Sequence, residues 1–176
     1  MLDSIDGKPS AAKTYFGAMQ MDWLKNALLN STATFKIIVT GSQVINPLSK
    51  AECMRVYSYE YNELLNFLSE SKIPGILFFT GDRHHSEVNK VERSGIYPLF
   101  DVTISPYTAS ISRVKGKELK SPYRIPNTLV EAQNFGKINV SGKKNERQLS
   151  ISFIGIKGEK LGEWSVSEKE LKLAGK

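Results

Sequence analysis

Segment 81–87 is the part of the sequence best suited to chemistry, because it reads Gly-Asp-Arg-His-His-Ser-Glu and holds both histidines of the 176-residue chain. Asp82, His84, His85 and Glu87 offer oxygen and nitrogen donors that suit zinc, manganese or iron, while the carboxylates alone suit calcium. The leading glycine permits a sharp turn, so the side chains after it can converge on one point. This cluster predicts a metal site, with ordinary surface or hydrogen-bonded histidines as the alternative.

Three further side chains in this region each allow two roles. Arg83 could recognise a phosphate group through both arms of its guanidinium, or form an ion pair with Glu87 or Asp82. Gln43 and Asn46 could supply an amide oxygen or orient a ligand. The Asn-Pro pair that begins at Asn46 is also typical of a turn, and we favour that role there.

Several other chemistries lack their motifs in this sequence. It has no Gly-x-Ser-x-Gly elbow, and because the two histidines are adjacent, no separate base serves a serine or cysteine triad. It also has no phosphate loop of the Gly-x-x-x-x-Gly-Lys type and no dinucleotide-binding Gly-x-Gly-x-x-Gly. Nucleophilic serine chemistry, nucleotide-dependent transfer and hydride transfer are therefore not expected.

The composition is that of a globular domain with a mild basic excess. Hydrophobic residues make up 40% of the chain and the formal net charge is +6, which is small enough that we read it mainly as an aid to solubility. One cysteine, Cys53, excludes an intrachain disulfide framework. The polar first residues predict no export signal in the sequence as given, and the longest apolar run, near 76–79, is too short to span a membrane.

The apolar pattern predicts an α/β order of elements in the first half. Residues 1–14 have the composition of a loop or lead-in segment. An amphipathic stripe over 20–29 predicts a helix in which Trp23 packs into the core. Residues 35–40 and 76–80 predict two buried strands, and a second stripe over 61–68 predicts the helix between them.

A strand, a helix and a strand in this order form a βαβ unit with parallel strands. Both strands then end at the same edge of the sheet, which is where ligands collect in open α/β sheets. We therefore expect the loops that begin at Gly41 and Gly81 to lie side by side. In the second half, apolar residues alternate over 148–153 and 161–166 around a turn at 157–159, which predicts an antiparallel hairpin with one solvated face. Ser167 and Glu170 have the spacing of a capping box and predict a short final helix through Leu173.

Taken together, these residues resemble the alkaline phosphatase D (PhoD-like) family of metallophosphoesterases. The most specific block is the Gly-Asp-Arg-His-His stretch with its flanks, and weaker motifs precede and follow it. The resemblance covers most of the chain and is carried by Tyr15-Phe16-Gly17, Gln20, Trp23-Leu24, 35–39, Gly41, 80–87, 97–103, Ser105-Pro106 and Asn134-Phe135-Gly136.

The resemblance implies a calcineurin-like core, a four-layer α/β/β/α sandwich of which this chain holds a βαβ unit followed by an antiparallel hairpin region. It implies that His84 is a metal ligand and that Asp82 is a metal ligand or phosphate contact. Arg83 and His85 would be the catalytic and phosphate-facing groups. The implied cofactors are divalent or trivalent ions, iron with calcium, with zinc or manganese as alternatives, and the implied reaction is hydrolysis of phosphate monoesters or diesters.

One departure from the pattern affects all these implications. Members of the superfamily carry Asp-x-His, Gly-Asp and Gly-Asn-His/Asp motifs upstream, and none stands before Gly81. Counted independently, segment 81–87 cannot supply two metal ions with about four to six ligands each. We therefore expect residues 15–176 to be the carboxyl-terminal half of a PhoD-like domain whose amino-terminal half is missing or is a partner chain. The full family protein would be exported, periplasmic or extracellular.

Two functions follow from this hypothesis. The first is a phosphatase or phosphodiesterase acting on a phosphorylated small molecule or phosphodiester, active only with its missing half. The second is a noncatalytic phosphate-binding or interaction module derived from such an enzyme. We do not expect nucleic acid as a partner, because no aromatic residues are interleaved with the lysines at 115–120 and 143–144.

Overall fold

The computed structural model describes residues 4–5, 8–10, 12–49 and 53–173. Within the predicted lead-in segment, β1 (Ser4–Ile5) and β2 (Lys8–Pro9) form a small antiparallel pair, so the described part of this segment is more ordered than a loop. The rest of the predicted lead-in segment, at 1–3, 6–7 and 11, lies outside the described residues. No helix in the described part of the chain has the length and apolar character needed to cross a bilayer.

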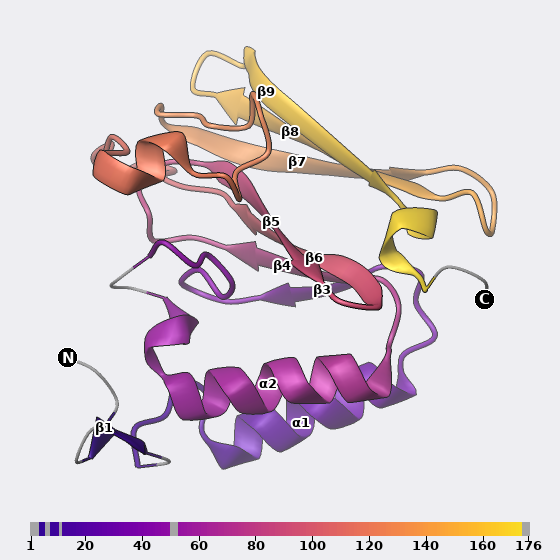
Figure 1. Ribbon diagram of the computed structural model, residues 1–176. Coiled ribbons are helices and arrows are strands. Elements are labelled where there is room, and N and C mark those ends of the chain that lie inside the picture. Colours follow the sequence, from indigo (N-terminus) through magenta and orange to yellow (C-terminus); the bar gives the residue numbers. More distant parts are fainter. Residues whose placement is uncertain (1–3, 6–7, 11, 50–52, 174–176) are drawn as a thin grey trace.

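A mixed four-stranded sheet with the order β3-β4-β6-β5 forms the centre of the molecule (Figure 1). β3 (Lys36–Val39) and β4 (Ile76–Thr80) are parallel and are joined through α2 (Ser58–Ser71), which confirms the predicted βαβ unit. β5 (Glu87–Arg93) and β6 (Ile96–Thr103) form a hairpin that the apolar pattern did not reveal. β6 lies between β4 and β5 and is parallel to β4.

Helices α1 (Ala18–Asn30) and α2 cover one face of this sheet (Figure 1). Met21, Leu24 and Leu28 of α1 are buried against the sheet and α2. The buried Glu60 carboxylate of α2 accepts hydrogen bonds from the backbone N–H groups of residues 15–17, at 2.5–2.8 Å, and so fixes the start of α1. The two helices are thereby held together at the end where α1 begins.

The prediction that Trp23 packs into the core is wrong, because its side chain is 69% exposed. Trp23 lines an open cavity of about 400 Å³ with Phe16, Gln20, Leu24, Ile38 and Val39, where α1 meets the edge strand β3. Among the strands the structure describes, none continues the sheet beyond β3. No described strand therefore covers the indole on that side.

The second predicted strand is buried throughout, but the first is not. Every residue of β4 is buried, as expected. In β3, buried Ile38 alternates with Ile37 and Val39, which are 38% and 77% exposed. β3 is therefore a half-covered edge strand, and the prediction that it is buried on both faces is wrong for its second face.

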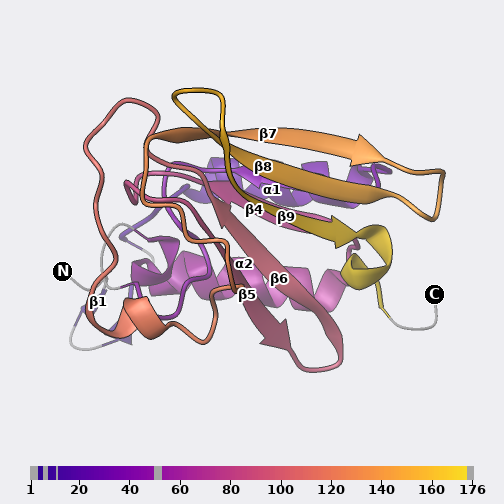
Figure 2. The same ribbon diagram turned by 90° about the horizontal axis from the view of Figure 1, so that it is seen from above.

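A three-stranded antiparallel sheet, β7-β8-β9, covers the other face of the central sheet (Figures 1 and 2). β8 (Gln148–Gly155) and β9 (Lys160–Ser167) are the predicted hairpin, and β7 (Asn134–Ser141) adds a third strand. Leu149, Ile151 and Phe153 point into the core between the sheets, as their alternation predicted. The described residues thus form three layers, helices on sheet on sheet, and not a complete four-layer sandwich.

Short 3-10 helices complete the described structure. They are η1 (Met54–Val56), η2 (Gly116–Lys120) and η3 (Glu168–Leu171). The predicted capping box is present, with the Ser167 side chain and the Glu170 backbone N–H bonded and the Glu170 carboxylate bonded to Ser167 N. The final helix is shorter than predicted, because η3 ends at Leu171.

Gly75, in the turn between α2 and β4, bonds both to the start of β3 and to the end of η3. Its carbonyl accepts from Lys36 N at 2.7 Å, and its N–H donates to Leu171 O at 2.9 Å. Its φ of +80° is left-handed, and a Cβ here would lie 2.0 Å from the carbonyl oxygen of Thr34. Only glycine fits this position without moving the backbone.

We predict that Gly75→Ala lowers the free energy of unfolding by about 3 kcal/mol or more, because left-handed strain and a backbone clash act together. Gly95→Ala is the matched control, since Gly95 has a φ of +70° and no atom lies within 4 Å of the point that its Cβ would occupy. Strain alone should cost the control about 1–2 kcal/mol. Urea denaturation measures both, and equal losses would contradict the prediction.

Candidate functional site

The loops that follow β3 and β4 meet at the carboxyl edge of the parallel strands, as predicted. Gly81 N donates to Gly41 O at 3.1 Å, which joins the two loops directly. The Tyr15 hydroxyl, just before α1, contacts Thr40 Oγ1 at 2.6 Å and Ser42 Oγ at 2.9 Å and so holds the loop after β3. The predicted juxtaposition of the two loops is therefore confirmed, because the carboxyl ends of parallel strands share one edge.

The backbone of segment 81–87 is unusual and well held. Asp82 and His84 have φ values of +64° and +58°, a left-handed conformation uncommon for residues other than glycine. His84 N donates to Ser105 Oγ at 3.0 Å, and His84 O accepts from Ser112 N at 2.9 Å. Such strained positions cluster at functional sites, where surrounding contacts hold them in place.

Glu87, the first residue of β5, is a buried anion on which several polar contacts of the site converge. Its carboxylate accepts hydrogen bonds from Gln43 Nε2 at 2.8 Å, Asn89 Nδ2 at 2.8 Å and Arg124 Nε at 2.7 Å. Burial alone would raise the pKa of Glu87, but its contacts with His85, Arg124, Asn89 and Gln43 outweigh burial and hold the pKa well below its usual range. Glu87 is therefore ionised, and the Arg124 guanidinium neutralises its charge.

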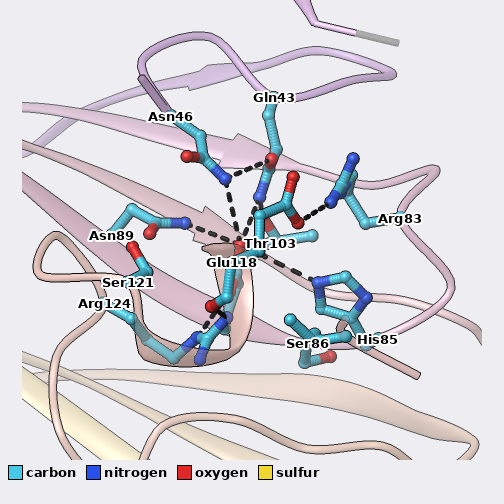
Figure 3. A network of polar contacts seen from close by, with 12 residues as sticks. Gln43, Asn46, Arg83, His85, Ser86, Asn89, Thr103, Glu118, Ser121 and Arg124 are labelled. Atoms are coloured by element: carbon cyan, nitrogen blue, oxygen red, sulfur yellow. Dashed lines mark hydrogen bonds and ion pairs between the residues drawn. The ribbon is translucent and has the colours of Figure 1, made fainter. Parts of the chain in front are cut away.

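His85 points inward toward this anion (Figure 3). Its side chain is 2% exposed, and Nε2 lies 3.8 Å from Glu87 Oε1, which is too far for a hydrogen bond. Within the described residues, neither ring nitrogen has a hydrogen-bond partner. A buried polar side chain without partners is costly, so the interior of the site has capacity for one more donor or acceptor.

Arg83 forms an ion pair, but neither Glu87 nor Asp82 is its partner. Its guanidinium pairs with Glu118 of η2 and donates from Nη1 to Ser49 Oγ at 3.3 Å (Figure 3). Glu87 is unavailable because Arg124 already neutralises it. The predicted ion pair is thus correct in kind and wrong in partner, since sequence alone did not reveal that η2 folds over the loop.

Gln43 and Asn46 both orient the site, and Asn46 also forms its predicted turn. Gln43 Nε2 uses its two protons on Glu87 and on Thr103 Oγ1, each at 2.8 Å, and Gln43 Oε1 accepts from Asn46 Nδ2 at 3.0 Å. Asn46 Oδ1 accepts from Leu48 N at 3.0 Å, which closes the turn. Each amide oxygen therefore already accepts a hydrogen bond within the protein.

Asp101 of β6 is a second buried carboxylate, and it holds the loop after β3 in place. Asp101 Oδ2 accepts from Val44 N at 2.7 Å and Ile45 N at 3.1 Å, and Oδ1 accepts from Thr80 Oγ1 at 2.6 Å. Complete burial raises the pKa of Asp101 to about 6, against the effect of these hydrogen bonds. The Thr80 hydroxyl also contacts Thr103 Oγ1 at 3.0 Å, which joins Asp101 to the Glu87 network.

Sequence reasoning missed the structural roles of Asp101, Glu118 and Arg124. A single acid in the apolar run Leu-Phe-Asp-Val was a usable signal for Asp101, because a buried carboxylate needs dedicated partners. Arg124 and Glu118 gave no such signal. Their contacts depend on segment 116–130 folding back over β5, with Asn89 bridged to Arg124 and Ser86 to Val130.

The donors that the structure describes do not by themselves form a metal centre. Asp82 is exposed and His84 is half-buried, while Glu87 is committed to Arg124. Among the residues that the structure describes, no group of three or more His, Cys, Asp or Glu side chains is placed to hold a metal ion. The roles proposed for Asp82 and His84 therefore stay predictions that require ligands from outside the described part of the chain.

Helices and an antiparallel sheet on opposite faces of a mixed sheet, with polar loops at the strand ends, define an α/β protein with a two-sheet core. A model of the PhoD-like phosphatase family matches residues 4–150, so the chain belongs to the PhoD-like phosphatase family. The fold is similar to that of the solved structure of PhoD, with a TM-score of 0.71 and 14% identity. No curated protein sequence gives a significant match.

The structural match is unequal in length. It covers 93% of this chain but 35% of the PhoD chain. This chain thus spans about a third of that protein, and it corresponds to part of the larger fold.

We predict that Glu87→Gln lowers the free energy of unfolding by about 3–5 kcal/mol, because it leaves the Arg124 guanidinium buried without its counterion. Glu92→Gln on the same strand is the control, since Glu92 is 71% exposed and pairs with Lys90 at the surface. Its loss should be below about 1 kcal/mol. Urea denaturation at pH 7 measures the free energy of unfolding of both variants. Comparable losses in the two would contradict the prediction that the buried Glu87 carboxylate stabilises the fold more than a surface carboxylate does.

We predict a pH-dependent effect for Asp101→Asn. Because the folded-state pKa of Asp101 is raised to about 6 from 3.8, ionisation of Asp101 costs the native state stability as pH rises between those values. The uncharged amide avoids this cost, so the variant should gain about 2–3 kcal/mol relative to the parent between pH 4 and pH 7.5. Urea denaturation at both pH values measures the change.

Asp22→Asn serves as the control for that titration, because Asp22 is exposed on α1 and water solvates its carboxylate. Its stability difference from the parent should stay constant over the same range. A constant difference for Asp101→Asn as well would rule out the assigned role of burial.

Proposed function

We propose that this chain contributes part of a metal-dependent phosphoric ester hydrolase, a phosphatase or phosphodiesterase of the PhoD-like family. The observation that carries the proposal is the position of segment 81–87. In a chain of this family, it leaves β4 at the carboxyl edge of the sheet in a strained turn, with two histidines, Asp82 and Arg83 in close succession. Phosphoryl transfer needs anion-binding and ligating side chains concentrated at such an edge.

Each residue of the turn has a role in this proposal. Asp82 and His84 would contribute ligands to a metal centre completed by other donors, and Arg83 and His85 would face the phosphate group. When bound, a metal ion would polarise the phosphoryl group and acidify a water molecule. The residues of this chain would bind and orient: Glu118 positions the Arg83 guanidinium through their ion pair, and the His85 ring lies with Nε2 3.8 Å from Glu87 Oε1.

A second candidate, a noncatalytic phosphate-binding module, is favoured by the donor count. Within the described residues, no three-ligand metal group is present, and Arg124 neutralises the second acid of the turn. A turn that keeps Arg83 but lacks a metal centre would bind anions without hydrolysing esters. The two candidates differ in turnover, not in fold.

The exposed strand edges support a role as one part of a larger catalytic unit. β7 residues Ile138 and Val140 lie opposite fully buried Ile151 and Leu149 on the same face of their sheet, yet they are 43% and 51% exposed. Val39 on β3 is also exposed. Apolar side chains on open edges are an association liability unless another segment covers them.

We infer that the remaining two thirds of the PhoD fold would cover these edges and complete the four-layer sandwich. In the complete protein, that part would supply the upstream ligands, either from the same chain or from a partner. The substrate would be a phosphorylated small molecule or a phosphodiester, and the complete protein would act outside the cytoplasm.

The test compares the isolated chain with the product of its native gene, using p-nitrophenyl phosphate and bis-p-nitrophenyl phosphate with added iron and calcium, zinc or manganese. We predict metal-dependent turnover in the native product and little or none in the isolated chain. Because losses of about 10–100-fold follow even from changes to groups that orient metal ligands, His84→Ala and Asp82→Asn should each reduce turnover by about 100-fold or more.

Asp22→Asn is the control for Asp82→Asn, because it makes the same change on the exposed surface of α1. It should leave turnover unchanged. Absence of turnover in both protein forms with every metal would overturn the hydrolase proposal and leave the phosphate-binding module.

A further inference from the structure

A cationic cleft opens beside segment 81–87, outside the Glu87 network. It has a volume of about 630 Å³, within the range of roughly 300–1,000 Å³ typical of small-molecule sites. Its lining contains four cationic side chains, one carboxylate and two apolar residues. The lining residues are Pro47, Leu48, Arg55, Arg83, Lys115, Lys117 and Glu118.

Four segments line the cleft, and hydrogen bonds hold them in place. Arg83 follows β4, and Arg55 of η1 donates from Nη1 to Pro47 O at 2.9 Å, which ties η1 to residues 47–48. The last segment, 115–118, is held because Arg124 Nη2 donates to Glu118 O at 2.8 Å while Arg124 Nε bonds Glu87. Through Arg124, the position of the cleft therefore depends on the buried Glu87 carboxylate, as does the rest of the site.

The charges in the cleft exceed what the protein neutralises. Glu118 pairs with Arg83, and both side chains are largely covered, at 19% and 15% exposed. Lys115 and Lys117 are exposed and form no ion pair with any described residue. Buried Arg83 Nε also has no hydrogen-bond partner in the described part of the chain. An anionic ligand would meet this surplus of donors and positive charge.

We propose that this cleft binds a ligand that carries two or more phosphate groups. A single phosphate would engage only part of a cavity of this size, whereas a chain of phosphates can span from Arg83 to the lysines of η2. Pro47 and Leu48 would contact the uncharged part of such a ligand. If the proposed hydrolase function holds, Arg83 faces the phosphate group being cleaved and the lysines hold a further phosphate group of the same ligand, but binding itself requires neither turnover nor metal.

The test is calorimetric titration of the purified chain with inorganic tripolyphosphate and with orthophosphate, in the presence of EDTA. We expect tripolyphosphate to bind and orthophosphate to bind more weakly. The double variant Lys115→Gln, Lys117→Gln should lose affinity for tripolyphosphate by about tenfold or more, because it removes two charges next to the ligand. Arg55→Gln should also weaken binding.

The matched control is Lys143→Gln, Lys144→Gln, which makes the same change in charge at exposed positions in the β7–β8 turn. It should bind tripolyphosphate like the parent. Equal weakening in the two double variants would indicate attraction to net charge alone and overturn the proposal, as would absence of binding to the parent. Since no metal is present and no ester is hydrolysed, the result stands apart from the outcome of the hydrolase assay.

Discussion

The buried Glu87 carboxylate is the interaction on which the site depends. An ion at 1% exposure is tolerated only where charge and hydrogen bonds replace water, and here the replacements come from separate parts of the chain. Gln43 belongs to the loop after β3, Asn89 to β5 and Arg124 to the segment beyond η2. Satisfying one anion therefore positions three segments at once and sets the shape of the carboxyl edge of the sheet.

The sequence predicted what local periodicity and chain order control. The βαβ unit, the meeting of the loops at Gly41 and Gly81, the late hairpin and the capping box at Ser167 all follow from patterns within a few residues of one another. The failures are non-local. Trp23 is exposed because the described sheet ends at β3, and Arg83 pairs with Glu118 because a segment more than thirty residues away folds over it. Such partners are set by topology, which no short window contains.

The edge strands of the two sheets differ in whether another segment covers them. This difference is relevant to the partial structural match with PhoD. At β5, residues 123–130 cover the edge through backbone hydrogen bonds and through bridges at Ser86 and Asn89. At β3 and β7 the described chain provides no covering strand, and apolar side chains remain exposed there. The central sheet thus has one covered edge, at β5, and one edge at β3 that no described strand covers, and exposed apolar edges favour association with another segment.

The two arginines of the site, Arg83 and Arg124, form ion pairs that differ in burial. This difference determines which of the two guanidinium groups a ligand in the cleft could contact. Arg124 is bound to a carboxylate that is almost fully buried, so removing that partner would leave the guanidinium with the full cost of an uncompensated charge. Arg83 is bound to Glu118 at the rim of an open cleft, where solvent and ligands compete for the guanidinium. In the proposed role of the cleft, a phosphate group would compete with Glu118 for Arg83, while Glu87, at 1% exposure, stays bound to Arg124. The deeper pair therefore keeps the loop rigid, while the shallower pair leaves Arg83 able to recognise an anion.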